Sequence, residues 1–375
     1  MSMSAVEWKK LGNVVNLSRG VVISKDYLRD NEGIYPVYSS QTANDGVLGR
    51  ISTYNYDGEF LTWTTDGANA GTVFHRFGKF SITNVCGLIK IKDEAIITYR
   101  YLYYWLNLVA KNYVLEGMGN PKLMSNAMGN IVIPLIPIAK QQEIVSHLDT
   151  FTSLISNLES ELDMRRKQYE HYRNQLLDFE GVEGVEWKTL GEVGEFVRGN
   201  GIQKKDFVED GYGCIHYGQV YTQFDLLAYE TITGIEKSLY DKCRKAKCGD
   251  IVLATTSENL EDVAKPVIWL GEEEIAVSGD AFIYKHNQNP IFIGSQFLTD
   301  RFSKFKGMNA KGAKVIRITG DSMAEYKIAL PSLEKQNEIA EGIKSFENLI
   351  QSLEQEIKLR KQQYEYYREK LLTFE

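Results

Sequence analysis

The chain has 375 residues, of which 43% are apolar and 25% charged, which is typical of a soluble protein with two or three cored domains. Its formal net charge is −7, and neither residues 1–139 (13 basic, 11 acidic) nor residues 181–333 (18 basic, 22 acidic) form a basic tail, which excludes binding driven mainly by diffuse positive charge. No run approaches the roughly 18 apolar residues of a membrane helix, and the N-terminus lacks an apolar leader, so we expect a cytoplasmic protein.

The first 139 residues resemble mixed α/β globular material with short strands. Residues 80–92 are rich in β-branched and aromatic side chains, and Gly, Asn and Asp interrupt such stretches. The most apolar segment, Tyr99 to Ala110, is too short to span a membrane and predicts a buried helix. The four cysteines are scattered, with no histidine at zinc-ligand spacing, so reduced thiols are expected.

Residues 140–180 change character and predict a long helix with a coiled-coil pattern. Apolar or aromatic positions recur in alternating steps of four and three, a 3.5-residue period typical of helices that pair. These positions, called the first seam, are Ile144, Leu148, Phe151, Ile155, Leu158, Leu162, Arg165, Tyr169, Tyr172 and Leu176.

Residues 181–333 repeat the first domain. Val6–Gly12 returns as Val185–Gly191 and Arg19-Gly20 as Arg198-Gly199, both 179 residues later, which also sets Tyr38 against Tyr217. We align Gly58–Leu61 and Thr64-Thr65 with Gly249–Val252 and Thr255-Thr256, 191 residues later. A repeat of this length predicts two copies of one structural unit.

Residues 334–375 repeat the long helix, 195 residues after the first. Its second seam has identical steps: Ile339, Ile343, Phe346, Ile350, Leu353, Ile357, Arg360, Tyr364, Tyr367 and Leu371. Twin seams favour mutual pairing over packing on separate domains. The linker after the first helix is short, so the simplest arrangement is antiparallel, with a rod of about 57 Å and a globular domain at each end. That span exceeds one turn of B-DNA, about 34–36 Å.

Motifs of catalysis are missing from the sequence. There is no phosphate-binding Gly-x-x-x-x-Gly-Lys loop and no His-Glu-x-x-His helix, and the five histidines show no metal or triad spacing. We therefore expect no catalytic residue and no metal site in this chain.

The repeated motifs resemble those of type I restriction-modification specificity subunits. Each half opens with Glu-Trp-Lys-x-Leu-Gly (Glu7–Gly12, Glu186–Gly191) and later carries Lys-Gln-x-Glu-Ile (Lys140–Ile144, Lys335–Ile339). Each long helix then has Gln-Tyr-Glu-x-Tyr-Arg (Gln168–Arg173, Gln363–Arg368) before Leu-Leu-x-Phe-Glu. The match covers essentially the whole chain, although almost no spacer precedes the first Trp motif.

This resemblance implies an α+β fold with two target recognition domains, residues 1–139 and 181–333, joined by conserved coiled-coil helices, residues 140–180 and 334–375. Each domain would read half of a bipartite DNA site, and the helix pair would set the spacer and dock two modification subunits. Those partners would carry S-adenosylmethionine for N6-adenine methylation, and restriction subunits would add ATP- and Mg-dependent translocation and cleavage.

Candidate DNA contacts are polar or basic side chains near expected strand ends, because direct readout needs donors and acceptors on groove-entering loops. In the first domain they are Ser39, Ser40, Gln41, Asn44, Thr64, Thr65, Asn69, Asn120 and Lys122. In the second they are Tyr217, Gln219, Thr255, Thr256, Ser257, Asn259, Lys311, Lys314 and Arg317. Ordinary solvated turns are the alternative for each residue. The loops differ between the copies, which predicts two different half-sites.

Candidate coiled-coil or partner residues are Leu148, Ile155, Leu162, Arg165, Tyr169, Tyr172, Ile343, Ile350, Ile357, Arg360, Tyr364 and Tyr367. Arg165 and Arg360 interrupt the seams at equivalent positions, where they either set the helix register or extend past the seam to solvent. The tyrosines either complete the seam or form a docking patch, since Tyr is enriched at interfaces.

Three other functions fit parts of this pattern. The recognition subunit of a type IIB-like bipartite system would differ only in its partners. A coiled-coil scaffold whose end domains bind proteins would show no DNA preference. An enzyme with an unrecognised active site would methylate DNA with S-adenosylmethionine alone.

Overall fold

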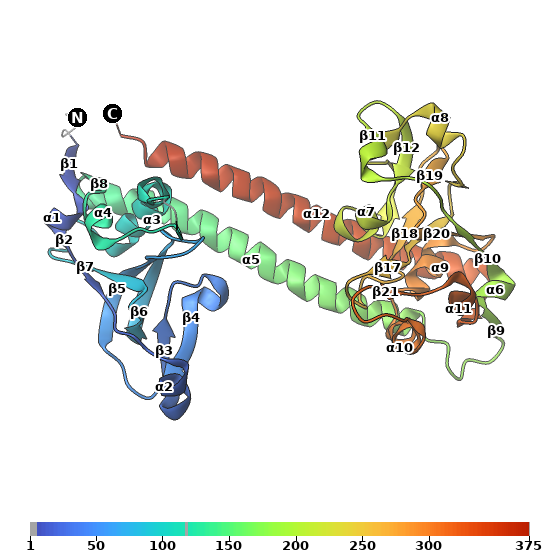
Figure 1. Ribbon diagram of the computed structural model, residues 1–375, viewed down its shortest axis with the longest axis horizontal. Coiled ribbons are helices and arrows are strands. Elements are labelled where there is room, and N and C mark those ends of the chain that lie inside the picture. Colours follow the sequence, from blue (N-terminus) through green and yellow to red (C-terminus); the bar gives the residue numbers. More distant parts are fainter. Residues whose placement is uncertain (1–5, 117–118, 375) are drawn as a thin grey trace. The chain divides into compact units, whose positions relative to one another are not determined.

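The computed structural model describes residues 6–116 and 119–374, so the start of the chain, from which the absence of a leader was inferred, lies outside the described residues. The chain forms two units: unit 1 comprises Met1–Leu158 and Ile357–Glu375, and unit 2 comprises Glu159–Glu356. In Figure 1 the blue and cyan elements belong to unit 1 and the yellow and orange elements to unit 2.

Unit 1 contains the elements before the first long helix. They are β1 (Glu7–Lys10), α1 (Leu11–Val14), β2 (Val15–Arg19), α2 (Lys25–Asp30), β3 (Glu32–Tyr38), η1 (Ala43–Gly46), β4 (Val47–Ile51), β5 (Tyr56–Thr64), β6 (Val73–Ile82), β7 (Cys86–Ile91), α3 (Tyr99–Val109), η2 (Ala110–Tyr113), α4 (Ser125–Gly129) and β8 (Val132–Leu135). The helix α5 (Ile138–Leu176) follows.

Unit 2 contains the elements between the long helices. They are β9 (Glu186–Thr189), α6 (Leu190–Val193), β10 (Gly194–Arg198), η3 (Lys204–Asp206), β11 (Phe207–Val208), β12 (Tyr212–Ile215), α7 (Tyr217–Thr222), β13 (Leu227–Ala228), β14 (Thr233–Ile235), α8 (Lys237–Tyr240), β15 (Lys245–Ala246), β16 (Ile251–Ala254), β17 (Thr256–Ser257), β18 (Pro266–Trp269), β19 (Ile275–Val277), β20 (Ala281–His286), α9 (Pro290–Gln296), α10 (Asp300–Asn309), β21 (Ile316–Arg317), α11 (Gly320–Ala324) and β22 (Lys327–Leu330). The helix α12 (Leu333–Leu371) follows.

Both units are built on the same four-stranded framework. Unit 1 has a sheet of order β2-β7-β5-β6-β3-β4, and unit 2 has one of order β10-β20-β16-β18-β13. Neighbours within β2-β7-β5-β6 and within β10-β20-β16-β18 are antiparallel. Unit 2 adds a second five-stranded sheet, β11-β14-β12-β19-β15. The predicted α+β class with an internal repeat is therefore confirmed.

Strand pairing corrects one part of the repeat alignment by one residue. Position 15 pairs with 91 and position 194 with 286, so the β7 and β20 residues correspond 195 apart. Leu61 lies opposite Ile89, and Ile251 lies opposite Tyr284, so Leu61 corresponds to Ile251 and not to Val252. The offset here is thus 190, and Thr65 matches Thr255. Because strand side chains alternate between faces, a one-residue slip would put Leu61 on the wrong face.

The repeat alignment of Tyr38 with Tyr217 is also wrong. Tyr38 pairs with Ile82 in parallel, and Ile215 pairs with Val277 in the same way. Tyr38 therefore corresponds to Ile215, and Tyr217 begins helix α7 two residues beyond. The aromatic identity was a coincidence that the hydrogen-bonding register overrides.

The predicted buried helix is present as α3. Thr98 caps its first turn by accepting a hydrogen bond from the Tyr101 backbone N–H, and the helix buries six of its eleven side chains. It packs on the sheet face that carries Leu61 and Trp63. Since aromatic side chains bury large areas, α3 is the main apolar cover of unit 1.

The glutamine of each Lys-Gln-x-Glu-Ile motif ties a long helix to its domain. Gln141 is fully buried, accepts a hydrogen bond from the Thr98 backbone N–H and donates to two backbone carbonyl oxygens. Gln336 is equally buried and accepts from the Asn289 backbone N–H at 3.1 Å. Buried amides need such partners, and these hydrogen bonds supply them at the start of each long helix.

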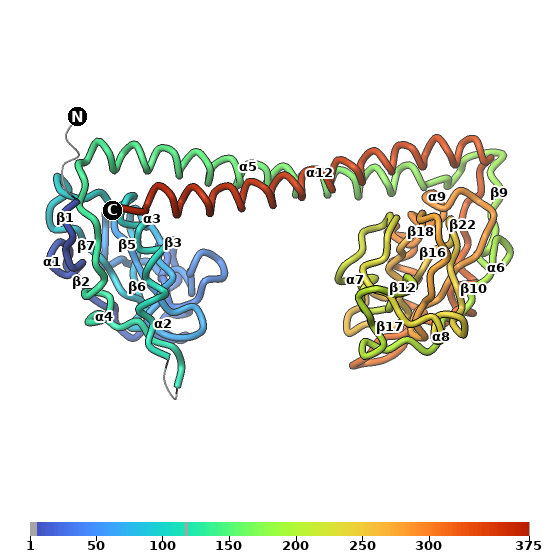
Figure 2. The backbone as a smooth tube through the Cα atoms, turned by 90° about the horizontal axis from the view of Figure 1, so that it is seen from above, coloured from blue at the N-terminus to red at the C-terminus, as the bar shows by residue number. Residues whose placement is uncertain are grey.

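The two long helices pack against each other in antiparallel fashion within each unit (Figure 1 and Figure 2). In unit 1 the Phe151 ring, near the start of α5, stacks on Tyr367, near the end of α12, with centroids 5.3 Å apart. In unit 2 Tyr169, near the end of α5, stacks on Phe346 of α12 at 5.7 Å. The twin seams therefore pair with each other, as their sequence pattern indicates.

The ends of the helices complete both units. Phe374, after α12, lies 6.4 Å from the Trp8 ring and 6.0 Å from the Trp105 ring in unit 1. Phe179, after α5, is buried against Phe292 in unit 2. The repeated Phe of the Leu-Leu-x-Phe motif thus packs, in each unit, against aromatic rings that are distant in sequence.

Equivalent seam substitutions test this division into units. Leu148 and Ile343 are fully buried, the first in the core of unit 1 and the second in that of unit 2. We expect Leu148→Ala or Ile343→Ala to lower the free energy of unfolding by about 2–5 kcal/mol, because each leaves a cavity in a packed core. Hydrogen exchange read by mass spectrometry should rise mainly in the unit that carries the change. Equal loss of protection in both units from either variant would contradict the division.

Candidate nucleic-acid interface

In unit 1 the ends of two strands and a later bridge bring four polar side chains together. The Arg19 guanidinium, at the end of β2, donates to the Thr65 hydroxyl at 3.2 Å and lies 3.6 Å from the Asp66 carboxylate. Lys122, which pairs with Asp66 through an isolated β-bridge, places its Nζ 3.9 Å from the same carboxylate. A single carboxylate therefore lies between two cations that come from distant parts of the sequence.

Two of the predicted loop clusters of unit 1 also meet. The Asn69 amide donates to the Thr42 hydroxyl at 3.0 Å, which joins the loop after β5 to the loop after β3. Asn44 and Asn69 are exposed, whereas Ser39, Ser40 and Gln41 are half-buried. The structure thus brings residues 39–44 and 64–69 to one surface.

A buried arginine holds the first of these loops. Arg76 of β6 is only 3% exposed, and its guanidinium donates to the Asp45 carboxylate and, at 2.7 Å, to the Asp45 carbonyl oxygen. It also lies over the Tyr38 ring, 3.7 Å from the centroid. Asn44 and Asp45 both adopt positive φ, a conformation that non-glycine residues rarely adopt without tertiary contacts.

Some predicted DNA contacts of unit 1 are buried and hydrogen-bonded within the protein. Thr64 and Thr65 are buried, and the Thr64 hydroxyl both donates to the Asn69 carbonyl oxygen and accepts from the Thr72 backbone N–H. These threonines shape the loop and do not face solvent. Asn120 and Lys122 are exposed, as a phosphate contact requires.

In unit 2 the structure joins two predicted stretches through one short sheet. Thr256 pairs with Arg317, and Ser257 pairs with Ile316. Thr255, Thr256 and Ser257 are buried, whereas Arg317, Lys311 and Lys314 are exposed. Asn259 is exposed but turns its amide to the Asp262 carboxylate at 2.8 Å.

The Tyr217 and Gln219 side chains lie in α7, where Gln219 has a structural role. Gln219 is buried, accepts from the His216 backbone N–H at 2.9 Å and completes a capping box with that histidine. Burial, and then the charge of Lys204, lower the pKa of His216, so its ring is neutral near pH 7. Tyr217 is half-buried and stays a candidate contact.

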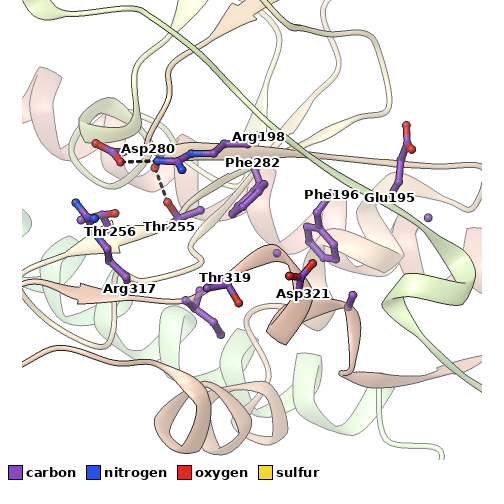
Figure 3. A pocket seen from close by; sticks show the side chains of 14 residues that line it. Glu195, Phe196, Arg198, Thr255, Thr256, Asp280, Phe282, Arg317, Thr319 and Asp321 are labelled. Carbon is purple, nitrogen blue, oxygen red and sulfur yellow. Dashed lines mark hydrogen bonds and ion pairs between the residues drawn. The ribbon is translucent and has the colours of Figure 1, made fainter.

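A cavity of about 470 Å³ opens beside these strands in unit 2. Figure 3 shows Arg198, Arg317, Thr255 and Asp280 at one end, and Glu195 and Asp321 at the other. The Arg198 guanidinium lies 3.5 Å from the Asp280 carboxylate and donates to the Gly279 carbonyl oxygen at 2.7 Å. Phe196 and Phe282 supply the apolar lining.

Sequence reasoning missed three arginines of these surfaces: Arg19, Arg76 and Arg198. The repeat of Arg-Gly in both halves was a signal for Arg19 and Arg198. Nothing in the local sequence marks Arg76, because its partners Asp45, Thr62 and Tyr38 come from other elements.

The two arginines that interrupt the seams, Arg165 and Arg360, each contact side chains one turn away on the same helix. Arg165 donates to Gln168 at 3.0 Å and pairs with Glu161, and Arg360 donates to Gln363 at 3.0 Å. This fits side chains that extend past the seam. Tyr169 is buried, whereas the seam residues Tyr172 and Tyr367 are 41% and 36% exposed.

Three further observations concern metal ligands, thiols and membrane-spanning helices. The described residues contain no group of three or more His, Cys, Asp or Glu arranged to hold a metal ion. The four cysteines are free, and burial raises the pKa of the Cys86 thiol to about 12. No helix within the described ranges is both long and apolar enough to cross a membrane.

Comparison with known proteins points to one family. A family model described as the type I restriction modification DNA specificity domain matches residues 3–164 and 182–359. A protein of Mycoplasma pneumoniae named as a type I specificity subunit, S.MpnORF507P, is 31% identical over 372 residues, 97% of each chain.

Solved structures agree at the level of the fold. The crystal structure of a type I restriction-modification S subunit from M. genitalium matches with a TM-score of 0.62 and 14% identity, over 99% of this chain and 97% of that one. A chain from a study of complex assembly and conformational transition of the type I system matches with a TM-score of 0.60 and 13% identity, over 98% and 97%.

Proposed function

The chain belongs to the type I restriction-modification DNA specificity family, and on that premise we propose that units 1 and 2 each read one half of an asymmetric, bipartite DNA site. The observation that supports this proposal is that the two units share four framework strands but differ in the segments inserted between those strands. The four-stranded frameworks match strand for strand, whereas the chain after the equivalent positions Tyr38 and Ile215 differs. Unit 1 has the loop Ser39–Gly46 and β4 there, and unit 2 has α7, β13, β14, α8 and β15 before the next framework strand. Different attachments on the same framework favour different half-sites.

The domain limits 1–139 and 181–333 are retained for the two recognition domains, with helices 140–180 and 334–375 as the connection. We propose that the paired helices set the number of unread base pairs. Each unit has a partly exposed helix tyrosine, Tyr367 in unit 1 and Tyr172 in unit 2, that fits a docking contact for a modification subunit, since Tyr is enriched at protein interfaces.

The chain itself is proposed to be non-catalytic. S-adenosylmethionine would bind the two modification subunits, and ATP and Mg the restriction subunits. This division is supported by the family and by the missing catalytic motifs of the sequence. A cytoplasmic location, where chromosomal DNA is accessible, follows from the same proposal.

Methylation mapping tests the proposed function. Cells that express this chain with its modification subunit should carry N6-methyladenine in one motif with two different halves and a constant unread gap. Cells that express the modification subunit alone are the control and should lack the motif. A motif with identical halves, or one without a gap, would contradict the proposal.

A further inference from the structure

Both units place an arginine at the same point of the framework. Arg19 ends β2 opposite Gly87, and Arg198 ends β10 opposite Phe282. A glycine must follow, because a Cβ on Gly20 would lie 2.0 Å from the Ile82 carbonyl oxygen and one on Gly199 2.3 Å from that of Ser278. The two backbones approach closely at these glycines, and each arginine lies at the end of an edge strand.

A second cation occupies equivalent positions in the two units. Lys122 is bridged to Leu115 and Asp66, and Arg317 is bridged to Lys311 and paired with Thr256. With the corrected register, Asp66 corresponds to Thr256, and Lys122 corresponds to Arg317. Two distant segments thus deliver a cation pair to each framework, Arg19 with Lys122 and Arg198 with Arg317.

The two cation pairs differ in what lies beside them. In unit 1 the Asp66 carboxylate, with a side chain 21% exposed, lies within 4 Å of both cations. In unit 2 the neutral Thr256 takes that position, and the cavity of Figure 3 opens between Arg198 and Arg317. No described side chain lies within ion-pair distance of the Arg317 guanidinium.

In unit 2 stability gives little reason for the ion pair of Arg198. The Arg198 side chain is 60% exposed and its Asp280 partner 37%, and exposed ion pairs contribute little to folding. A net charge of −7 without a basic tail also means that backbone affinity must come from a few placed cations. Because the cation pairs are shared while the loops differ, their ligand should be common to both half-sites.

We infer that Arg19 with Lys122 and Arg198 with Arg317 are two phosphate clamps, each binding one DNA-backbone phosphate without regard to sequence. The divergent loops would then read bases from a registered position. In unit 1 the Asp66 carboxylate occupies the place of a phosphate between the cations until DNA displaces it. This inference rests on the proposed function and assigns it a sequence-independent part.

The test uses the complex with its modification subunits and measures Kd against salt on the cognate site and on a scrambled duplex. A plot of log affinity against log salt concentration has a negative slope, and removing one phosphate contact should reduce the magnitude of that slope by about 0.9. For R19A/K122A or R198A/R317A, the affinity ratio of parent to variant should therefore change about three- to fourfold between 50 and 200 mM salt. Both duplexes should lose affinity by a similar factor, roughly tenfold at low salt.

Two sets of variants control for charge and folding. K140A/K335A likewise removes two exposed cations, one from each unit and each paired with a glutamate one turn away, and should leave the slope unchanged. R19K and R198K keep the charge and should keep most of the slope.

The outcomes separate this inference from the proposed function. An unchanged salt slope in the clamp variants, or a loss confined to the cognate duplex, would overturn the clamps. Equal binding of the two duplexes by the parent complex would instead refute sequence-specific reading itself.

Discussion

Replacement of Arg76 by alanine is expected to abolish recognition of one half-site and leave the other intact. Arg76 is the buried support of the loop Ser39–Gly46, with bonds to Thr62 and Asp45 and contacts to Tyr38. Without it the positive-φ turn at Asn44 and Asp45 loses its partner. We expect unit 1 to lose about 2–4 kcal/mol of stability, since charge-assisted hydrogen bonds and a ring contact disappear together.

Competition binding with singly changed duplexes measures the effect on recognition. Changes in the half-site read by unit 1 should cease to matter for Arg76→Ala, although each normally costs about 1–3 kcal/mol. Base changes in the other half-site should keep their full cost, because unit 2 does not depend on Arg76. The strand register places Trp269 at the equivalent position of unit 2. Arg76→Lys retains charge but not the planar fork, so an intermediate loss is expected.

Lys79→Ala is the matched control for Arg76. Lys79 lies on the same strand but is exposed, and its main contact is with the Tyr54 ring, so its removal should lower stability much less than removal of Arg76 and leave half-site preference unchanged. Two results would contradict this prediction: the same behaviour of both variants, or an equal loss of affinity of Arg76→Ala for all duplexes. Either would mean that base reading by unit 1 does not depend on the support that Arg76 gives to the loop.

Removal of one heptad from each long helix is expected to shorten the preferred spacer. Deleting Ser156–Leu162 together with Gln351–Ile357 preserves the seam, because seven residues rotate a straight helix by only about 20°. The helix pair becomes about 10.5 Å shorter, equivalent to about three base pairs of DNA. Affinity for the original site should fall on the order of a hundredfold, since simultaneous engagement of both halves is lost.

A duplex series with spacers shortened one base pair at a time measures this result. The deletion protein should bind best to a shorter spacer or bind every duplex weakly. Deletion of Ser156–Leu162 alone is the control, because unequal helices cannot keep their stacked pairs in register, and it should destabilise the protein. An unchanged spacer and affinity after the paired deletion would mean that the helices do not set the distance.

The sequence determined the repeat and the twin seams. Each of these is a local or periodic pattern: the 3.5-residue spacing, the buried helix at Tyr99 and the Lys-Gln-x-Glu-Ile starts are readable along one stretch of chain. The family resemblance followed from motifs that occur twice. The matched family model and the antiparallel helix contacts agree with these predictions.

Only the tertiary structure decided which polar residues are available and how the two copies align. Nothing in the sequence separates Thr64, Thr255 and Gln219 from other loop residues, yet they are buried and hydrogen-bonded within the protein. Strand register depends on hydrogen bonds between strands that are distant in sequence. Alignment by residue identity alone was therefore wrong by one residue at Leu61. Arg76 and the cation pairs have their meaning through partners far along the chain, because folding converts separation in sequence into contact in space.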